Sequence, residues 1–430
     1  MKNPALFATL AWTALSSVTA LNLPRQVSHP ELKGMTVFGY QGWYPIRYAN
    51  NTGTNFKWFS PPDVTPGPPN YPQTQVLTDV LPYTADYAAE CLLDTNFILA
   101  NGQHAKFYTS YCTSVIEAHF QYMVKYKIDG IFVQRFFDAA TPSNEFYQQF
   151  LFVLNTVRTM AEKYGKYFAV EYDFSGKPAD WDPNFYMPIL VDDYVNILVP
   201  LFQSPSYIYS EGRPVVELWG AGINPDGLTG SKWKNLVTAY LEADEHPFVI
   251  LGIPHNWLDY RTPSRDPTGY WAAYEIADCL QPWPVGAFSN VGDLEWSVKN
   301  ELVPGKAQAD AMGVKYSGAF TPGGSNRNAA RSLDNIPPLG NRYNGTFYEE
   351  QLKVFSNSTI KPFFNFGAMF DEYTEATQIL PMLKNSELPT NPNPGFLGID
   401  DNMDIFYYMA LSGQYTTAFH STWGQAPLSL

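Results

Sequence analysis

Short apolar runs alternate with amphipathic stretches along most of the chain. The runs are rich in β-branched and aromatic side chains, which is typical of buried strands. Eight such runs are predicted strands, at 36–42, 129–135, 167–172, 214–219, 248–253, 278–284, 316–321 and 363–370. The stretches between them show helical spacing, and the predicted helices span 114–127, 145–164, 230–242, 270–277, 298–312 and 348–357. This alternation predicts a (β/α)8 TIM barrel, in a single domain over 21–430 with long βα loops.

Two further segments, 104–110 and 194–201, also have strand character, so the alternative is that the chain has more than eight strands. A doubly wound open sheet is the competing architecture, but no Gly-x-Gly-x-x-Gly turn follows the first predicted strand. The proline-rich segment 61–72 predicts a long, rigid loop after that strand. The segment 385–394 leads into a C-terminal piece that we expect to cover the barrel.

The last predicted strand ends at three clustered carboxylates, Asp371, Glu372 and Glu375. In barrel enzymes the C-terminal tips of the strands carry the chemistry, and two glutamates three positions apart form a candidate acid/base pair. The same cluster also fits a solvated helix N-terminus, where acidic side chains offset the helix dipole. We therefore expect Glu372 and Glu375 to be catalytic and Asp371 to bind substrate.

Polar and aromatic side chains also follow the other predicted strands. Sugars present flat CH faces and many hydroxyls, so a saccharide site needs aromatic platforms beside carboxylates, amides and guanidinium groups. The predicted substrate-binding residues are Tyr40, Gln41, Trp43, Arg135, Glu171, Tyr172, Asp173, Trp219, Trp257 and Trp283. For each tryptophan ordinary core packing is the alternative. For Glu171 and Glu217 the alternative is a structural ion pair, with Arg135 as the candidate partner of either.

The charge balance narrows the range of partners. The 430 residues include 27 basic and 41 acidic side chains, which gives a net charge of -14 and a pI near 4.8. Such a surface disfavours nucleic acids and anionic membranes. The six histidines are scattered and no Cys-x-x-Cys or His-Glu-x-x-His pattern occurs, so we expect no metal and no other cofactor. We expect a monomer.

The N-terminal segment predicts secretion. Residues 1–20 combine Lys2, an apolar run from Ala5 to Leu15 and a small-x-small cleavage site at Val18–Ala20. A membrane anchor is the alternative, but the run is too short to span a bilayer. The mature, extracellular chain is expected to begin near Leu21.

Sequons and cysteines agree with an extracellular location. Predicted glycosylation sites lie at Asn50, Asn344 and Asn357. Among the three cysteines, Cys91 and Cys112 flank a short polar segment and form the expected disulfide. Cys279 lies in an apolar run and is expected to be a buried free thiol.

Five motifs occur together in order: Gly39–Trp43, Ile128–Phe136, Glu171–Gly176, Arg213–Gly220 and Ala368–Glu372. This ordered set resembles the landmarks of glycoside hydrolase family 71/99-like proteins. The resemblance covers the chain from about Gly39 to Gly413. It implies a (β/α)8 barrel and a secreted glycosidase that acts on an oligo- or polysaccharide.

Within that group, the endo-α-1,2-mannosidases of family 99 carry a Glu-Trp-His-Glu-Gly-Thr-Gln segment, which the segment Glu372–Gln378 resembles. The resemblance implies that Glu372 acts as a base on the sugar 2-hydroxyl and Glu375 as acid/base at the glycosidic oxygen, with net retention through a 1,2-anhydro sugar. The chain departs from the family segment at Tyr373, Thr374 and Ala376, and Asp371 replaces the usual asparagine.

Other reaction schemes stay open at this stage. A conventional pair would place Asp173 or Glu171 as the second carboxylate, in a retaining or an inverting arrangement. A secreted carbohydrate-binding protein without activity, a lyase and a transglycosylase are further alternatives. The sequence predicts neither the sugar and its linkage nor endo against exo action.

Overall fold

The computed structural model describes residues 28–46, 54, 56–60, 75–175, 183–223, 228–262, 264–287, 290–329, 342, 345–357, 359–389 and 395–424. The predicted signal peptide, the sequons at Asn50 and Asn344 and the proline-rich segment 61–72 lie outside these residues.

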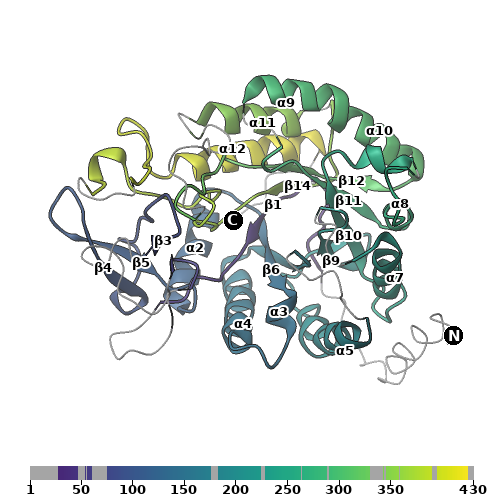
Figure 1. Cartoon of the computed structure of the whole chain (residues 1–430), viewed down its shortest axis with the longest axis horizontal. Helices are drawn as coiled ribbons and strands as arrows, with labels where there is room; N and C mark the ends of the chain where they lie inside the picture. Colours follow the sequence, from purple (N-terminus) through teal and green to yellow (C-terminus); the bar gives the residue numbers. More distant parts are fainter. Residues whose placement is uncertain are drawn as a thin grey trace.

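A parallel barrel forms the centre of the molecule (Figure 1). Its strands are β1 (Thr36–Tyr40), β6 (Gly130–Phe136), β7 (Tyr167–Asp173), β9 (Arg213–Trp219), β10 (Phe248–Pro254), β11 (Cys279–Trp283), β12 (Lys315–Tyr316), β13 (Gly318–Phe320) and β14 (Asn365–Gly367). Their order is β12-β11-β10-β9-β7-β6-β1-β14-β13. Only Ser317 separates β12 from β13, and its amide donates to the Leu280 carbonyl at 2.9 Å. The two short strands therefore act as one interrupted strand that closes the barrel, and the predicted (β/α)8 architecture is confirmed.

Helices surround the barrel on its outer face, as strand–helix alternation requires (Figure 1). They are α2 (Thr113–Lys125), α3 (Phe137–Ala140), α4 (Tyr147–Tyr164), α5 (Pro183–Asp193), α6 (Val199–Leu201), α7 (Gly230–Leu241), α8 (Trp271–Tyr274), α9 (Val291–Ser297), α10 (Val303–Met312), α11 (Thr346–Ser356) and α12 (Tyr407–Thr422). Turns of π-helix over Tyr194–Leu198 and Val298–Leu302 precede α6 and α10. Short 3-10 turns lie at Ala89–Cys91, Trp257–Arg261 and Asn385–Glu387.

The remaining strands lie outside the barrel path. Strands β2 (Phe59–Ser60) and β3 (Gln75–Val76) pair with each other, and β8 (Tyr209–Ser210) pairs with β9. Strands β4 (Leu92–Ile98) and β5 (His104–Tyr108) form an antiparallel hairpin that projects to one side of the barrel (Figure 1). The predicted strand at 104–110 is therefore real but is no part of the barrel.

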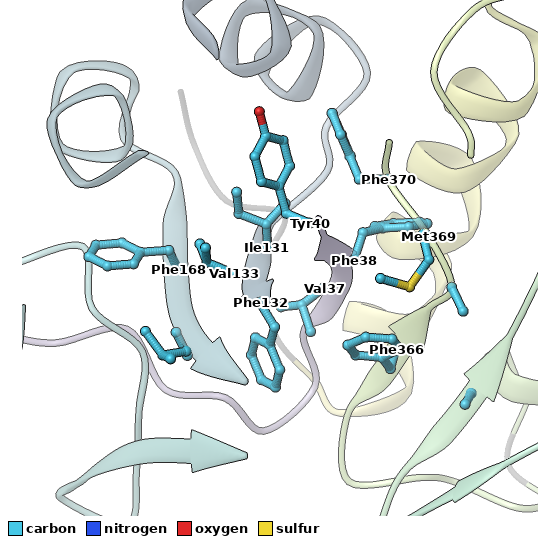
Figure 2. Close-up of a cluster of buried hydrophobic side chains, with 14 of the residues drawn as sticks. Val37, Phe38, Tyr40, Ile131, Phe132, Val133, Phe168, Phe366, Met369 and Phe370 are labelled. Carbon is cyan, nitrogen blue, oxygen red and sulfur yellow. The ribbon is translucent and has the colours of Figure 1, made fainter. Parts of the chain in front are cut away.

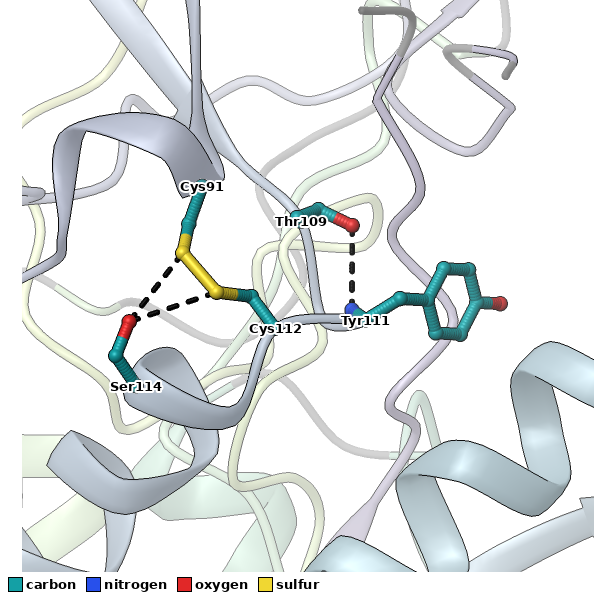
Figure 3. The surroundings of a disulfide bond; sticks show 5 residues. All are labelled: Cys91, Thr109, Tyr111, Cys112 and Ser114. Atoms are coloured by element: carbon teal, nitrogen blue, oxygen red, sulfur yellow. Dashed lines mark hydrogen bonds between the residues drawn. A yellow bond between two sulfur atoms is a disulfide. The ribbon is translucent and has the colours of Figure 1, made fainter. Parts of the chain in front are cut away.

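A disulfide closes the base of this hairpin. Cys91 and Cys112 are bonded to each other, as predicted, and the Ser114 hydroxyl lies within hydrogen-bond distance of both sulfur atoms (Figure 3). The Thr109 amide donates to the Cys91 carbonyl at 2.9 Å. Cys279 is a buried free cysteine on β11, also as predicted. The bond ties the hairpin to the start of α2.

The segment 194–201, which had an alternative strand prediction, is helical instead. Tyr194 and Leu198, four positions apart, are both buried, so the apolar run follows the period of a helix that packs on the barrel. A short apolar run does not distinguish a buried strand from a buried helix, which is why the sequence pattern was ambiguous here.

Large side chains fill the barrel interior. Phe132 and Phe366 face each other with ring centroids 5.9 Å apart, whereas Tyr40 and Phe370 lie on the other side of β1 (Figure 2). A Cβ atom at Gly39 would come within 2.2 Å of Met369 Cε. Because Gly39 has no side chain, the neighbouring Met369 side chain has room in the interior.

The C-terminal helix α12 covers the outside of the barrel, as expected for this segment. It packs on α11 and on the end of α2, where a Cβ atom at Gly413 would lie 1.6 Å from the Tyr126 carbonyl oxygen. The Asp129 Oδ2 atom links it to the barrel, because this atom lies 2.9 Å from both His420 Nε2 and the Thr36 amide nitrogen. Within the described ranges, no helix is long and apolar enough to span a bilayer.

Candidate active site

A cleft of about 350 Å³ opens at the C-terminal ends of the barrel strands. Its lining residues belong to the ends of β1, β6, β7, β9, β11 and β14 and to the loops that follow: Gln41, Trp43, Lys57, Gln134, Phe136, Asp173, Ser175, Trp219, Trp283, Val285, Ala368, Met369, Glu372, Glu375 and Thr377. Barrel enzymes assemble their catalytic groups at this end. Both predicted catalytic glutamates are in the cleft.

Glu372 is held firmly at the cleft floor. It is 1% exposed, and its Oε1 atom accepts from the Tyr44 hydroxyl at 2.8 Å and from the amides of Thr374 and Glu375 at 2.6 and 3.2 Å. No described residue donates to its Oε2 atom. Burial raises the pKa of Glu372 to about 8, and the nearby charge of Glu375 adds to this, whereas Tyr44 and Lys57 oppose it.

Glu375 is the exposed member of the pair and faces the cleft. Its carbonyl oxygen accepts from the Ser325 amide at 2.7 Å, which fixes the backbone while the carboxyl group stays accessible. Burial of the carboxyl group raises the pKa of Glu375; Lys57 lowers this pKa and Asp173 raises it further.

Lys57 supplies a positive charge beside these carboxylates. Burial lowers its pKa, and Glu372, Glu375 and Asp173 act in the opposite direction. Its backbone carbonyl accepts from the Thr374 hydroxyl at 3.1 Å, so the lysine is tied to the loop that carries both glutamates. Sequence reasoning missed this residue, because it belongs to a long loop without apolar periodicity.

Asp371 holds the loop after β1 and does not line the cleft. Its carboxylate accepts from the amides of Gln41 and Gly42 at 2.7 and 2.9 Å, and the side chain is fully buried. Burial raises its pKa to about 7, and the two amides oppose the shift. The structure thus gives Asp371 a supporting contact in place of the predicted contact with substrate.

Beneath the cleft lies a layer of inward-facing polar side chains. Glu171 and Glu217 are neighbours in register on β7 and β9, and both are fully buried. Glu171 accepts from Gln134 Nε2 at 3.0 Å, and Glu217 accepts from Gln281 Nε2 at 2.6 Å. Burial raises the pKa of Glu171 to about 8 and the pKa of Glu217 above its ordinary range. Glu171 therefore lies below the cleft surface, and the alternative of an ion pair with Arg135 is realised by neither glutamate, because Arg135 pairs with Asp193.

Arg135 and Tyr172 point away from the cleft. Side chains alternate along a strand, so the neighbours of Gln134 and Glu171 face the outer helices. Arg135 Nε donates to Asp193 Oδ2 on α5 at 2.6 Å, and the Tyr172 hydroxyl donates to the same atom at 2.6 Å. The predicted substrate contacts of Arg135 and Tyr172 are replaced by this buried cluster outside the barrel.

Tyr40 and Trp257 are also absent from the cleft lining. The Tyr40 hydroxyl lies 2.9 Å from Nδ1 of the buried His119 on α2, behind β1. Trp257 is fully buried and stacks on Trp271, with ring centroids 5.4 Å apart. For these two aromatics the structure supports core packing, the alternative weighed above.

Aromatic rings form the walls of the cleft. Trp43 stacks on Phe136, with centroids 4.7 Å and planes 12° apart. Trp219 meets Trp283 edge to face, with centroids 5.2 Å apart. Of the aromatics predicted to contact substrate, Trp43, Trp219 and Trp283 are thus brought together in the cleft. Phe136 was not predicted, although its place at the end of β6 is a signal that could have identified it.

Asp173 and Gln41 complete the predicted residues that line the cleft. Asp173 Oδ1 accepts from the Ser175 amide at 2.7 Å, and its charge acts on Lys57 and Glu375. The Gln41 side chain is 7% exposed, and its Oε1 atom has no partner among the described residues. Both residues place polar atoms beside the two glutamates.

Comparison with solved structures finds the same architecture. A GH99 endo-alpha-mannosidase from Bacteroides thetaiotaomicron aligns with a TM-score of 0.62 and 14% identity, over 91% of this chain and 99% of that chain. The same enzyme in complex with bis-tris propane gives 0.60 and 14% over the same shares. A glycoside hydrolase-like protein gives 0.55 and 12%, over 93% and 98%. At these identities the likeness concerns the fold.

No protein-family model matches the chain, and no curated protein matches its sequence.

Proposed function

We propose that the protein is a secreted glycoside hydrolase that cleaves α-linked glycan or polysaccharide chains with retention. The observation that carries the proposal is that Glu372 and Glu375 both line a cleft with aromatic walls at the C-terminal end of a barrel. The solved structures with the same fold include a GH99 endo-alpha-mannosidase and a glycoside hydrolase-like protein, which supports this class of reaction.

The surroundings of Glu372 suit a base with one free oxygen. Three donors occupy Oε1 and favour the ionised form, whereas Oε2 has no partner among the described residues. A hydroxyl group of a bound sugar is a fitting donor to Oε2. Lys57 also favours the ionised form, but burial and the charge of Glu375 outweigh these contacts and raise the pKa of Glu372 to about 8, so its base form gains population as the pH rises towards that value.

The surroundings of Glu375 suit a proton donor. The group faces the cleft, and its raised pKa keeps it protonated further towards neutral pH than a carboxyl group in water. In the second step Glu375 can act as a base, because it is ionised once the leaving group has taken its proton.

The proposed reaction has two balanced steps. In the first, Glu372 takes the proton of the 2-hydroxyl, O2 forms a bond to C1, and the bond from C1 to the leaving oxygen breaks as Glu375 protonates that oxygen. In the second, Glu375 takes a proton from water, the water oxygen bonds to C1, and the C1–O2 bond breaks as O2 recovers its proton from Glu372. Two inversions at C1 give net retention.

Asp173 supports the conventional alternative. It lines the cleft, and its charge raises the pKa of Glu375, so the two carboxylates are electrostatically linked. As a nucleophile or base it would pair with Glu375 in the manner common to other glycosidases. Glu171 is less suited to this role because it is fully buried.

Secretion and glycosylation belong to the same proposal. The disulfide between Cys91 and Cys112 suits an oxidising compartment. Asn357 lies exposed at the end of α11, where an oligosaccharide has room. These features support an extracellular enzyme.

A substrate screen with product analysis tests the proposal. Purified protein is incubated with an α-mannan, an α-glucan and a pentose-containing polysaccharide, and the products are separated by size. We expect hydrolysis of one class and a loss of about 10²- to 10⁴-fold in Glu375→Gln. Glu242→Gln, an exposed residue at the end of α7, is the matched control and should retain full activity. Full activity of Glu375→Gln would refute the assignment.

A further inference from the structure

An aromatic strip leads from the cleft towards the protein surface. It begins at the stacked pair of Phe136 and Trp43 in the cleft wall. Lys57 Nζ lies 3.5 Å from the ring centroid of Trp43 and 5.0 Å from that of Phe56. Phe56 stacks in turn on Phe146, with centroids 5.3 Å and planes 19° apart. We call these five residues the aromatic strip.

The outer end of the aromatic strip is accessible. Phe56 is 41% exposed, and Phe146 is partly exposed. A single exposed phenylalanine needs no explanation. Phe56 differs from a scattered surface residue because contacts through Lys57 and Trp43 connect it without interruption to the cleft that holds the two glutamates.

The turn that carries Phe56 is anchored to the rest of the protein. Trp58 is fully buried, and its Nε1 atom donates to the Tyr108 carbonyl at 2.9 Å. The Lys57 carbonyl accepts from the Thr374 hydroxyl, and the Phe56 amide donates to Thr54 Oγ1 at 3.2 Å. The rings are therefore held in place before any ligand arrives, which lowers the entropic cost of binding.

We propose that the aromatic strip is an extended subsite that binds sugar units of a chain beyond those at the scissile bond. The exposed parts of the Phe56 and Phe146 rings offer apolar contact to the CH faces of sugars, and the Lys57 ammonium offers donors to their hydroxyls. The inference rests on the proposed function, since a scissile bond must lie beside Glu375. It adds that the substrate is a long chain, whose remote units contribute to binding.

Two phenylalanine variants test the inference. Phe56→Ala removes the outer platform, and Phe152→Ala, on α4, removes a ring that is 38% exposed and does not belong to the aromatic strip. On the polysaccharide that the wild type cleaves, we expect kcat/KM to fall about tenfold in Phe56→Ala and to stay unchanged in Phe152→Ala. The loss should shrink as oligosaccharides from the same polymer become shorter.

The outcomes separate this inference from the proposed function. If the wild type cleaves a polysaccharide and both variants match it at every chain length, the aromatic strip is no subsite but the hydrolase remains. If no polysaccharide is cleaved, binding is measured as the retardation of the protein during electrophoresis in gels that contain α-mannan, α-glucan or arabinan. Retardation that Phe56→Ala loses and Phe152→Ala keeps supports the subsite without hydrolysis. No retardation, or equal retardation of both variants, overturns it.

Discussion

Two glutamates three positions apart occupy different surroundings in this protein. Glu372 is buried with one oxygen saturated by donors, and Glu375 faces the cleft. The difference arises because the backbone amides of Thr374 and Glu375 turn towards the first carboxylate. Each glutamate is thereby suited to a different partner, Glu372 to the sugar 2-hydroxyl and Glu375 to the leaving oxygen and the attacking water, which is the basis of the roles proposed for them.

A fluorinated substrate distinguishes the role of Glu372 as a base from a role as nucleophile. If Glu372 acts on the 2-hydroxyl, a 2-deoxy-2-fluoro glycoside should not be cleaved and should leave the protein mass unchanged. The reason is that fluorine has no proton to give. Intact-protein mass spectrometry followed by peptide mapping is the measurement. A peptide with a sugar ester on Glu372 would contradict the role, and an ester on Asp173 would favour the conventional alternative.

Glu171 should make the protein less stable in alkaline solution. Burial raises its folded pKa to about 8 from an ordinary value of 4.5, so the folded state binds its proton more tightly than the unfolded state. The resulting stabilisation is full below about pH 4.5 and is lost as the pH rises towards about 8. Glu171→Gln keeps an acceptor for Gln134 and removes this titration.

We therefore expect the wild-type melting temperature to fall between pH 5 and pH 8, and to fall less in Glu171→Gln. Glu242→Gln, whose side chain is exposed, should melt like the wild type at both values. Thermal unfolding followed by circular dichroism measures the difference. Identical pH dependence in the wild type and Glu171→Gln would contradict the assignment.

At the scale of elements, the apolar runs predicted every barrel strand. They did not predict which side chains of each strand face the barrel interior. Parallel strands are buried on both sides, so hydrophobicity does not mark which residues point inwards. This is why Arg135 and Tyr172 were predicted to bind substrate together with Glu171, although they contact Asp193 outside the barrel.

Lys57 escaped prediction for a different reason. It reaches the site through a loop contact with Thr374, and a tertiary contact of this kind leaves no periodic signal in the sequence. The paired glutamates, by contrast, lie in the loop after the last barrel strand, which the sequence predicted at 363–370 and the structure places at Asn365–Gly367.

A buried aspartate between elements should position the loop that carries Glu375. Asp79 accepts from the amides of Asn328 and Arg327 at 2.9 and 2.8 Å and from the Ser325 hydroxyl, and the Ser325 amide in turn donates to the Glu375 carbonyl. We expect Asp79→Asn to lower kcat by about tenfold with little change in KM, because one acceptor oxygen is lost.

Steady-state kinetics on the cleaved polysaccharide measure this effect. Asp94→Asn, at an exposed position on β4, is the control and should leave both constants unchanged. The loss in Asp79→Asn should be smaller on an aryl glycoside, whose leaving group depends less on Glu375. A change in KM alone would refute the positioning role.

The disulfide should stabilise the β4–β5 hairpin and leave the chemistry unaffected. Cys91 and Cys112 are 21 positions apart, and closing a loop of this length stabilises a protein by roughly 3 kcal/mol. Replacing both residues with serine should lower the free energy of unfolding by about that amount in denaturant titrations while kcat persists. Peptide mapping of the wild type should find this bond and a free Cys279; a bond that involves Cys279 would contradict the structure.

At the scale of the whole molecule, the barrel gathers residues from distant parts of the chain into one cleft. Gln41, Asp173 and Glu375 are far apart in sequence, yet the closed order of parallel strands brings their strand ends together. Carboxylates take up protons in mild acid, so the net charge of -14 becomes smaller in magnitude. Electrostatic repulsion within the folded state is therefore weaker in mild acid.

The dependence of Glu375→Gln on the leaving group tests the central claim most directly. The values of kcat/KM for the wild type and the variant are measured on the cleaved polysaccharide and on an aryl glycoside of the same sugar with a strongly acidic phenol. The account predicts a loss of about 10²- to 10⁴-fold on the polysaccharide and a much smaller loss on the aryl glycoside, which leaves without a proton. Equal losses on both substrates, or no loss on the polysaccharide, would contradict the role of Glu375 as the acid.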